Sequence, residues 1–137
     1  MRILFLDDNK DRHAEFRRQS IGCVVDFVFD ATSAIEKMES DKYDVIFLDH
    51  DLGGPASENK IIEGAEDGFF VCKWIAENPD LYSETTIIIH SLSQFGPLRM
   101  LEILAQAGIY SVIYMKEAWR VFEKVSNDEF VLRRRLE

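Results

Sequence analysis

The sequence predicts a doubly wound α/β fold, in which a five-stranded parallel sheet is covered on both faces by five helices. Three observations support this fold class. Five short apolar runs recur along the chain, segments with helical spacing lie between them, and capping or helix-breaking residues fall near the boundaries. Strands that alternate with helices favour a parallel sheet with right-handed crossovers. A chain of 137 residues suits one domain with a hydrophobic core, so we expect a single domain over residues 1–137.

The five apolar runs are the expected strands. They are Ile3–Leu6, Cys23–Phe29, Val45–Leu48, Thr86–Ile89 and Tyr110–Met115. Each is apolar almost throughout and most are rich in Val, Ile, Phe or Tyr, which is typical of parallel strands buried on both faces. The second run is the least regular, because Asp26 interrupts it.

The segments between the runs show the spacing of amphipathic helices. The clearest apolar stripes are Ala31, Ala34, Ile35 and Met38 in the second helix, and Leu101, Leu104, Ala105 and Gly108 in the fourth. Asp30 or Thr32 is expected to cap the second helix. The first helix, about 10–20, is more polar.

Two further expectations concern the first and last helices. In the first helix we expect Ala14 and Phe16 to be buried and His13 to face solvent, because charged residues surround the histidine. Val121, Phe122 and Val125 form a stripe that predicts a fifth helix after the last strand.

Composition and charge narrow the possible partners and location. The net charge of −9 argues against broad binding to a nucleic-acid backbone, which needs a surplus of Lys and Arg. No apolar run approaches the length of a membrane span, and the N-terminus turns acidic at residue 7, unlike a signal peptide. Cys23 and Cys72 have apolar neighbours, so we expect them to be buried free thiols. The expected location is the cytoplasm.

Chemically active residues follow four of the five expected strands. They are Asp7 and Asp8 after the first, Asp49, His50 and Asp51 after the third, His90 and Ser91 after the fourth, and Lys116 after the fifth. In open α/β sheets, ligands bind at the carboxyl ends of the strands. We therefore expect these residues to converge on one site.

Converging carboxylates without cysteine suit a hard cation, and Mg²⁺ fits best because it takes a few carboxylates and keeps several waters. Without a cation, Asp7, Asp8 and Asp49 would repel one another. An Asp carboxylate can act as a nucleophile toward a phosphoryl group, and a bound cation neutralises the charge that develops. A purely structural ion pair between Asp49 and Lys116 is the alternative.

The ordered set of residues resembles the receiver domain of two-component response regulators, the CheY-like superfamily with a flavodoxin-like fold. The resemblance implies that Asp7 and Asp8 hold Mg²⁺ and that Asp49 is the phosphoacceptor, forming a phosphoaspartate. It also implies that Asp51 places a backbone carbonyl on the metal, that Ser91 and Lys116 contact the phosphoryl group, and that Ser91 and Tyr114 form the switch. The partner would be a histidine kinase or a phosphotransfer protein. Asp67-Gly68 matches the acidic-Gly step that opens the third helix.

The stretches "LDHDLGG" and "IHSLS" resemble one branch of these domains, the cyclic-phosphate processing receivers. This resemblance implies Mg²⁺-assisted chemistry on a phosphoester. Two histidines can divide the proton transfers of such a reaction, and His50 and His90 are the candidates for acid and base. Strict alternation points His50 away from Asp49, and it allows only one of His90 and Ser91 to face the site. Two departures from ordinary receivers are Glu117 after the lysine, where proline is usual, and a long segment at 52–66.

Three functions remain open at this point. The first is a stand-alone receiver in which Asp49 accepts a phosphoryl group in phosphorelay signalling. The alternative is an enzyme that processes cyclic phosphates or related phosphoesters with Mg²⁺, His50 and His90. The third is a degenerate receiver that acts only as an interaction module.

Overall fold

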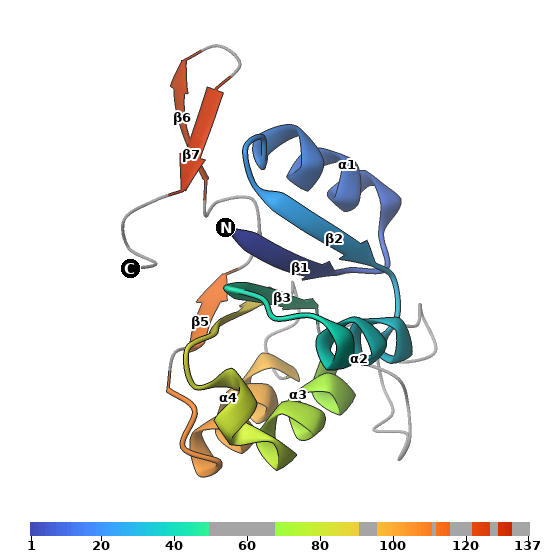
Figure 1. Ribbon diagram of the computed structural model, residues 1–137, viewed down its shortest axis with the longest axis vertical. Helices are drawn as coiled ribbons and strands as arrows, with labels where there is room; N and C mark the ends of the chain where they lie inside the picture. The colour runs from blue at the N-terminus through green and yellow to red at the C-terminus, as the bar shows by residue number, and fades with distance from the viewer. Residues whose placement is uncertain (50–67, 91–95, 111, 116–121, 127–128, 133–137) are drawn as a thin grey trace.

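Five parallel strands form one sheet in the order β2-β1-β3-β4-β5 (Figure 1). The computed structural model describes residues 1–49, 68–90, 96–110, 112–115, 122–126 and 129–132. The strands are β1 (Arg2–Leu6), β2 (Val24–Val28), β3 (Val45–Asp49), β4 (Thr86–His90) and β5 (Val112–Met115). The predicted parallel sheet and all five of its strands are therefore confirmed.

In the described part of the chain, four α-helices pack on the two faces of this sheet. They are α1 (Lys10–Gln19), α2 (Ala31–Ser40), α3 (Gly68–Glu77) and α4 (Gly96–Gln106), and the short 3-10 helix η2 (Pro79–Tyr82) follows α3. Helix α1 lies on one face, whereas α2, α3 and α4 lie on the other (Figure 1). None of the helices in the described part of the chain is long and apolar enough to cross a membrane.

The alternation of side chains along the strands divides the core between these two faces. The larger cluster includes Leu4, Leu6, Ile46, Leu48 and Ile87, and it packs against α2, α3 and α4. The smaller cluster on the α1 face consists of Ile3, Phe5, Phe16, Val45, Phe47 and Ile88. The same alternation places Asp7, just past the end of β1, and Asp49 and His90, the last residues of β3 and β4, on the α1 face.

Asp26 interrupts the second apolar run because β2 is an edge strand of the sheet. Its carboxylate accepts a hydrogen bond of 2.6 Å from the hydroxyl of Tyr43, and Arg2 lies 3.5 Å away. The Tyr43 hydrogen bond lowers the pKa of Asp26 below its usual value. A partly exposed edge thus accommodates a charge that a central strand would exclude.

Helix α1 begins at a cap and buries a different stripe from the one expected. The side chain of Asn9 accepts the backbone N–H groups of Asp11 and Arg12, at 2.9 and 3.0 Å. Phe16 is fully buried as predicted, but Ala14 is exposed and His13 is only 5% exposed. The expectation of a solvent-facing His13 was therefore wrong, because ring stacking and a backbone hydrogen bond hold it inside.

The prediction of a fifth helix after β5 was also wrong for the residues that the structure describes there. Phe122–Ser126 (β6) and Glu129–Leu132 (β7) form an antiparallel pair with Phe122 opposite Leu132. Both segments contain the Phe and Val residues that strands favour, and the intervening Asn127-Asp128 is a turn-forming pair. These signals outweigh the short stripe at Val121, Phe122 and Val125. In place of the fifth helix, this part of the chain carries a two-stranded sheet.

The expected cap of the second helix is confirmed, because Asp30 accepts the N–H of Ser33 at 2.7 Å. The third helix begins at Gly68, which lies against the backbone of Asp49. A Cβ built on Gly68 would collide with the Asp49 carbonyl group and would lie 3.0 Å from Cε of Met100. Position 68 therefore requires glycine, because only glycine lets the start of α3 approach the backbone of β3 this closely. The contact holds the N-terminus of α3 against the end of β3.

We predict that Gly68→Ala destabilises the protein by about 1–3 kcal/mol, because the added methyl group forces the backbone of Asp49 or of α3 to move. Urea denaturation in the absence of divalent cations measures this change. Ala105→Ser, on the exposed side of α4, is the matched control and should cost at most about 0.5 kcal/mol. Equal stability of Gly68→Ala and the wild type would contradict the close approach.

Candidate functional site

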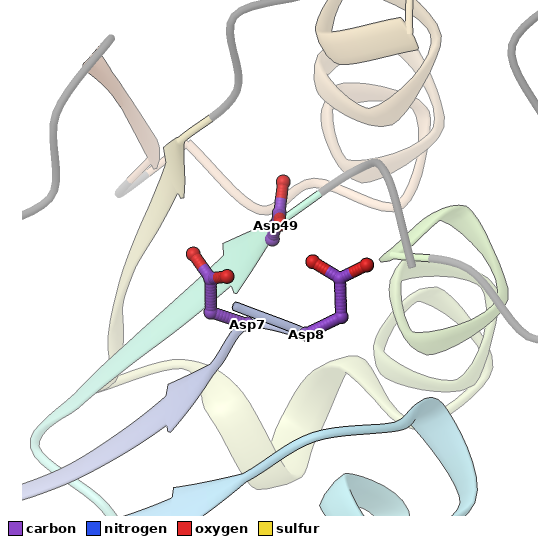
Figure 2. A group of neighbouring side chains, drawn as sticks. All are labelled: Asp7, Asp8 and Asp49. Atoms are coloured by element: carbon purple, nitrogen blue, oxygen red, sulfur yellow. The ribbon is translucent and has the colours of Figure 1, made fainter. Parts of the chain in front are cut away.

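Three carboxylates meet at the carboxyl ends of β1 and β3. Asp7 and Asp8 follow β1, and Asp49 is the last residue of β3, which pairs with β1. One carboxylate oxygen from each residue lies within 4.8 Å of the other two. Figure 2 shows the three side chains projecting from the same edge of the sheet. The predicted convergence of these residues, here named the carboxylate cluster, is present in the structure.

The carboxylate cluster is buried on one side and open on the other. Asp7 is fully buried and Asp49 is 3% exposed, whereas the side chain of Asp8 is 36% exposed. A buried carboxylate is costly unless a cation or several donors compensate it. The cluster therefore needs positive charge, and Asp8 marks the side from which solvent can supply it.

The guanidinium of Arg12 provides part of this charge. Its Nε lies 2.7 Å from Oδ2 of Asp7, and its Nη2 lies 3.2 Å from Oδ2 of Asp49 and 3.4 Å from Oδ1 of Asp8. Burial alone would lower the pKa of Arg12, but the hydrogen bond and charge of Asp7, with the charges of Asp49 and Asp8, raise it above its usual value. One side chain thus contacts the whole cluster.

Arg12 was missed by sequence reasoning, although a signal was present. Arg12 follows Asp8 by four residues at the start of a predicted helix, which is the spacing of an acidic and basic pair on one helix face. That signal identifies the Asp8 contact only. The contact with Asp49, 37 residues away, depends on the tertiary fold.

The turn between β1 and α1 holds Asp7 in place through both its side chain and its backbone. Oδ1 of Asp7 accepts the backbone N–H of Asn9 at 2.8 Å. The carbonyl oxygen of Asp7 lies 2.7 Å from Nε2 of His13, which must therefore carry the proton and donate it. Burial lowers the pKa of His13, and its ring stacks on Phe29 at a centroid distance of 4.1 Å. His13 is thus a neutral support of the site.

His90 is the histidine that joins the cluster. It pairs with Asp49 in the β3–β4 register, and its Nδ1 lies 3.6 Å from Oδ2 of Asp7. The ring stacks on Phe5 at a centroid distance of 5.3 Å, with the two planes 2° apart. The side chain of His90 thus faces the site, as alternation from Ile88 on the α1 face predicts.

Burial governs the charge of His90. The residue is 3% exposed, and its burial, opposed by the charge of Asp7, lowers its pKa from 6.5 to about 4. His90 is therefore neutral at pH 7 and forms no ion pair with Asp7, despite their proximity. Its Nε2 is buried without a hydrogen-bond partner in the part of the chain that the structure describes.

The remaining predicted site residues lie outside the described residues, and their roles stay predictions. These are His50, Asp51, Ser91 and Lys116, together with the segment at 52–66. Tyr114 lies in β5 and pairs with Ile89, but its side chain also falls outside the described part. The site as described thus comprises the carboxylate cluster, Arg12 and His90.

The donor set of the carboxylate cluster fits a small divalent cation. Mg²⁺ binds oxygen at about 2.1 Å in an octahedron, so neighbouring ligands lie about 3.0 Å apart and opposite ones about 4.2 Å. The three oxygens, within 4.8 Å of one another, need to close by at most about 2 Å to reach that spacing. Three carboxylates without cysteine favour Mg²⁺ over softer metals, and waters would complete its coordination.

We predict that His90 makes stability depend on pH. In the unfolded chain His90 binds a proton below its ordinary pKa of 6.5, whereas the folded protein resists protonation down to about 4. The resulting stability, about 3 kcal/mol, is complete above pH 6.5 and is lost as the pH falls toward 4.

Replacement of His90 by Phe tests this dependence, because Phe keeps the stack on Phe5 and cannot titrate. Urea denaturation without divalent cations measures the free energy of unfolding at about pH 7 and pH 5. Between these two pH values it should fall by about 2 kcal/mol more in the wild type than in His90→Phe. The pH dependence that remains in His90→Phe includes a contribution from His13, whose pKa is also lowered. Equal pH dependence of the two proteins would show that His90 is not held neutral by burial.

Comparison with known proteins gives one family and one fold. A sequence profile described as "Cyclic-phosphate processing Receiver domain" matches residues 2–106. No curated protein sequence matches the chain.

Solved structures of receiver domains share its fold at low identity. A CheY-like receiver domain from Methanospirillum hungatei JF-1 aligns with a TM-score of 0.62 and 16% identity, over 87% of this chain and 84% of that one. Chemotaxis protein CheY4 from Vibrio cholerae aligns with a TM-score of 0.61 and 18% identity, over 85% and 86% of the two chains.

A two-component response regulator from Clostridium difficile aligns with a TM-score of 0.58 and 21% identity, over 86% of this chain and 84% of that one. At such identities these structures support the flavodoxin-like receiver fold and nothing finer. The profile match covers β1 to α4, which includes the whole carboxylate cluster and His90. This chain belongs to the family of cyclic-phosphate processing receiver domains.

Proposed function

We propose that this protein binds Mg²⁺ on Asp7, Asp8 and Asp49 and uses the site to hydrolyse a cyclic phosphodiester. The observation that carries the proposal is the position of His90, 3.6 Å from Asp7 and in register with Asp49. In phosphoryl transfer to an Asp, the carboxylate is itself the nucleophile and a cation neutralises the developing charge, so no histidine is required. Hydrolysis of a phosphodiester also requires proton transfer, for which histidine is the usual side chain. The description of the family supports the same proposal.

The proposed reaction needs two proton transfers and charge stabilisation. Water attacks the phosphorus atom and loses a proton, one ester P–O bond breaks, and the leaving oxygen gains a proton, which yields a phosphomonoester. Mg²⁺, when bound, neutralises charge on the phosphoryl oxygens. His50 and His90 are the candidates for the two transfers. The acid and base roles stay undivided between them, because a pKa of about 4 makes the neutral His90 a weak base.

His90 also has a positioning role in this proposal. A side chain that lies against a ligand carboxylate restricts its orientation, and such partners typically tune metal affinity by 10–100-fold. The stack on Phe5 and the contact with Asp7 give His90 this position. The family resemblance assigns a backbone carbonyl of Asp51 to the metal as well.

A second candidate function is phosphoryl transfer to Asp49 in phosphorelay signalling. The observation that favours it is that Asp49 ends the central strand β3 with its Oδ2 3.2 Å from a cation, the Arg12 guanidinium. A carboxylate beside positive charge is suited to attack phosphorus. In this case a histidine kinase or phosphotransfer protein supplies the phosphoryl group, Ser91 and Lys116 contact it, and Ser91 and Tyr114 form the switch.

Asp8 is the carboxylate whose replacement tests the Mg²⁺ site most directly. Asp8→Asn removes an exposed ligand without burying a new group, and it should weaken Mg²⁺ binding at least about tenfold in isothermal titration calorimetry. It should lower the hydrolysis of cyclic mononucleotides or 2′,3′-cyclic phosphate ends, followed by ³¹P NMR, at subsaturating Mg²⁺. Asp11→Asn is the control, because Asp11 lies in the first turn of α1 and is exposed.

Two results would count against the cyclic-phosphate proposal. One is the same Mg²⁺ affinity in Asp8→Asn and Asp11→Asn. The other is unchanged turnover in the His50→Ala, His90→Ala double variant. A folded wild-type protein that binds no Mg²⁺ would instead favour the interaction module.

Intact-mass spectrometry separates the two candidate functions. After incubation with Mg²⁺ and a small acyl phosphate, a phosphoacceptor gains a phosphoryl adduct in the wild type and in Asp11→Asn but not in Asp49→Asn. For the cyclic-phosphate enzyme we expect turnover of a cyclic phosphate and no lasting adduct. An adduct in wild type without any cyclic-phosphate turnover would assign the protein to phosphorelay signalling.

A further inference from the structure

We propose that Arg12 is an internal counter-cation that exchanges with Mg²⁺. Without metal its guanidinium compensates the carboxylate cluster. When Mg²⁺ binds, the guanidinium leaves the cluster and binds the phosphate group of the substrate. This inference rests on the proposed function, because it takes the carboxylate cluster to be the Mg²⁺ site.

The contacts of Arg12 involve the same groups that would ligate the metal. Nη2 alone contacts Asp49 and Asp8, at 3.2 and 3.4 Å, and Nε contacts Asp7 at 2.7 Å. A metal ion shared by these three carboxylates must lie between their oxygens, beside the position that the guanidinium now takes. Two cations at such short range repel each other strongly in a partly buried site. Arg12 and Mg²⁺ therefore compete for the cluster.

The side chain of Arg12 has a route out of the cluster. It is 31% exposed, and its nearest exposed acidic neighbour, Asp8, is 36% exposed. Its backbone is fixed in the first turn of α1 by the Asn9 cap, so only side-chain torsions need to change. The long side chain can thus turn toward solvent while its Cα stays beside the site.

Formal charges explain why a displaced Arg12 would meet the phosphate. Three carboxylates with one Mg²⁺ sum to −1, which repels an anionic phosphodiester. A guanidinium at the rim brings the sum to zero before the phosphate binds. Arg also presents paired N–H donors that match the oxygens of a phosphate group. The displaced side chain therefore supplies charge and geometry that the metal-bound cluster lacks.

A purely structural role for Arg12 predicts the opposite effect on metal binding. If Arg12 only orients the three carboxylates, its removal leaves them disordered and lowers the affinity for Mg²⁺. If Arg12 competes with Mg²⁺, its removal raises that affinity. The sign of the change separates the two roles.

The experiment compares Arg12→Gln, Arg12→Lys and Lys10→Gln with the wild type. Lys10 is exposed in the same turn, so Lys10→Gln removes one positive charge at a similar position without touching the cluster. In calorimetry we expect Arg12→Gln to bind Mg²⁺ about tenfold more tightly than the wild type, within the usual range of coupling between competing ligands. Lys10→Gln should change the affinity by about twofold or less.

Phosphate binding supplies the second readout. With Mg²⁺ saturating, inorganic phosphate should bind about tenfold more weakly to Arg12→Gln than to the wild type, and Arg12→Lys should fall between them. If Arg12→Gln is too unstable for calorimetry, thermal unfolding measures its response to Mg²⁺ instead. The melting temperature of Arg12→Gln should be lower than that of the wild type in EDTA and should rise more on addition of Mg²⁺.

The outcomes separate this inference from the proposed function. Weaker or equal Mg²⁺ binding in Arg12→Gln, or unchanged phosphate binding, overturns the role of Arg12 and leaves the metal site intact. A wild-type protein that does not bind Mg²⁺ overturns the proposed function itself. Tighter Mg²⁺ binding together with weaker phosphate binding supports the exchange.

Discussion

The burial of the Asp7 carboxylate is the constraint around which the site is organised. A fully buried carboxylate needs several partners, and Asp7 receives the N–H of Asn9 and the guanidinium of Arg12, with His90 alongside. Its carbonyl oxygen is bound by His13. These contacts join the end of β1, the first turn of α1 and the end of β4 into one polar group. Satisfying this charge therefore fixes the first turn of α1 on the sheet, and the buried Phe16 anchors the helix farther along.

The low polarity beneath this group increases the strength of each contact. Phe5, Phe47 and Ile88 lie directly below Asp7, Asp49 and His90 on the α1 face, since residues two apart on a strand share a face. Aromatic side chains exclude water there, which strengthens electrostatic interactions and lowers the pKa of His90 to about 4. The same environment that makes the carboxylates costly also increases the benefit of a bound cation. Arg12 meets part of that need, and a divalent cation would meet more of it.

The sequence predicted the positions of the five strands and the meeting of Asp7, Asp8 and Asp49, because both follow from local rules. Buried parallel strands are continuous apolar runs, and their carboxyl ends share one edge of the sheet. Local rules failed where two weak signals competed. The stripe at residues 121–125 suggested a helix, but the Phe and Val content of two short segments favoured strands, and they pair as β6 and β7. Charged neighbours suggested an exposed His13, although its ring stacks on Phe29.

What the sequence by itself determined is the parallel α/β framework and the set of acids at its edge. Periodicity of 2 or 3.6 residues and the order of elements suffice for these. Only the tertiary structure decided which side chains share the site. Arg12 contacts Asp49 across 37 positions of sequence, and His90 turns toward Asp7, because the β3–β4 register sets the face on which it lies. Charge compensation and register act through space, and no local pattern encodes the partner that each buried carboxylate finds.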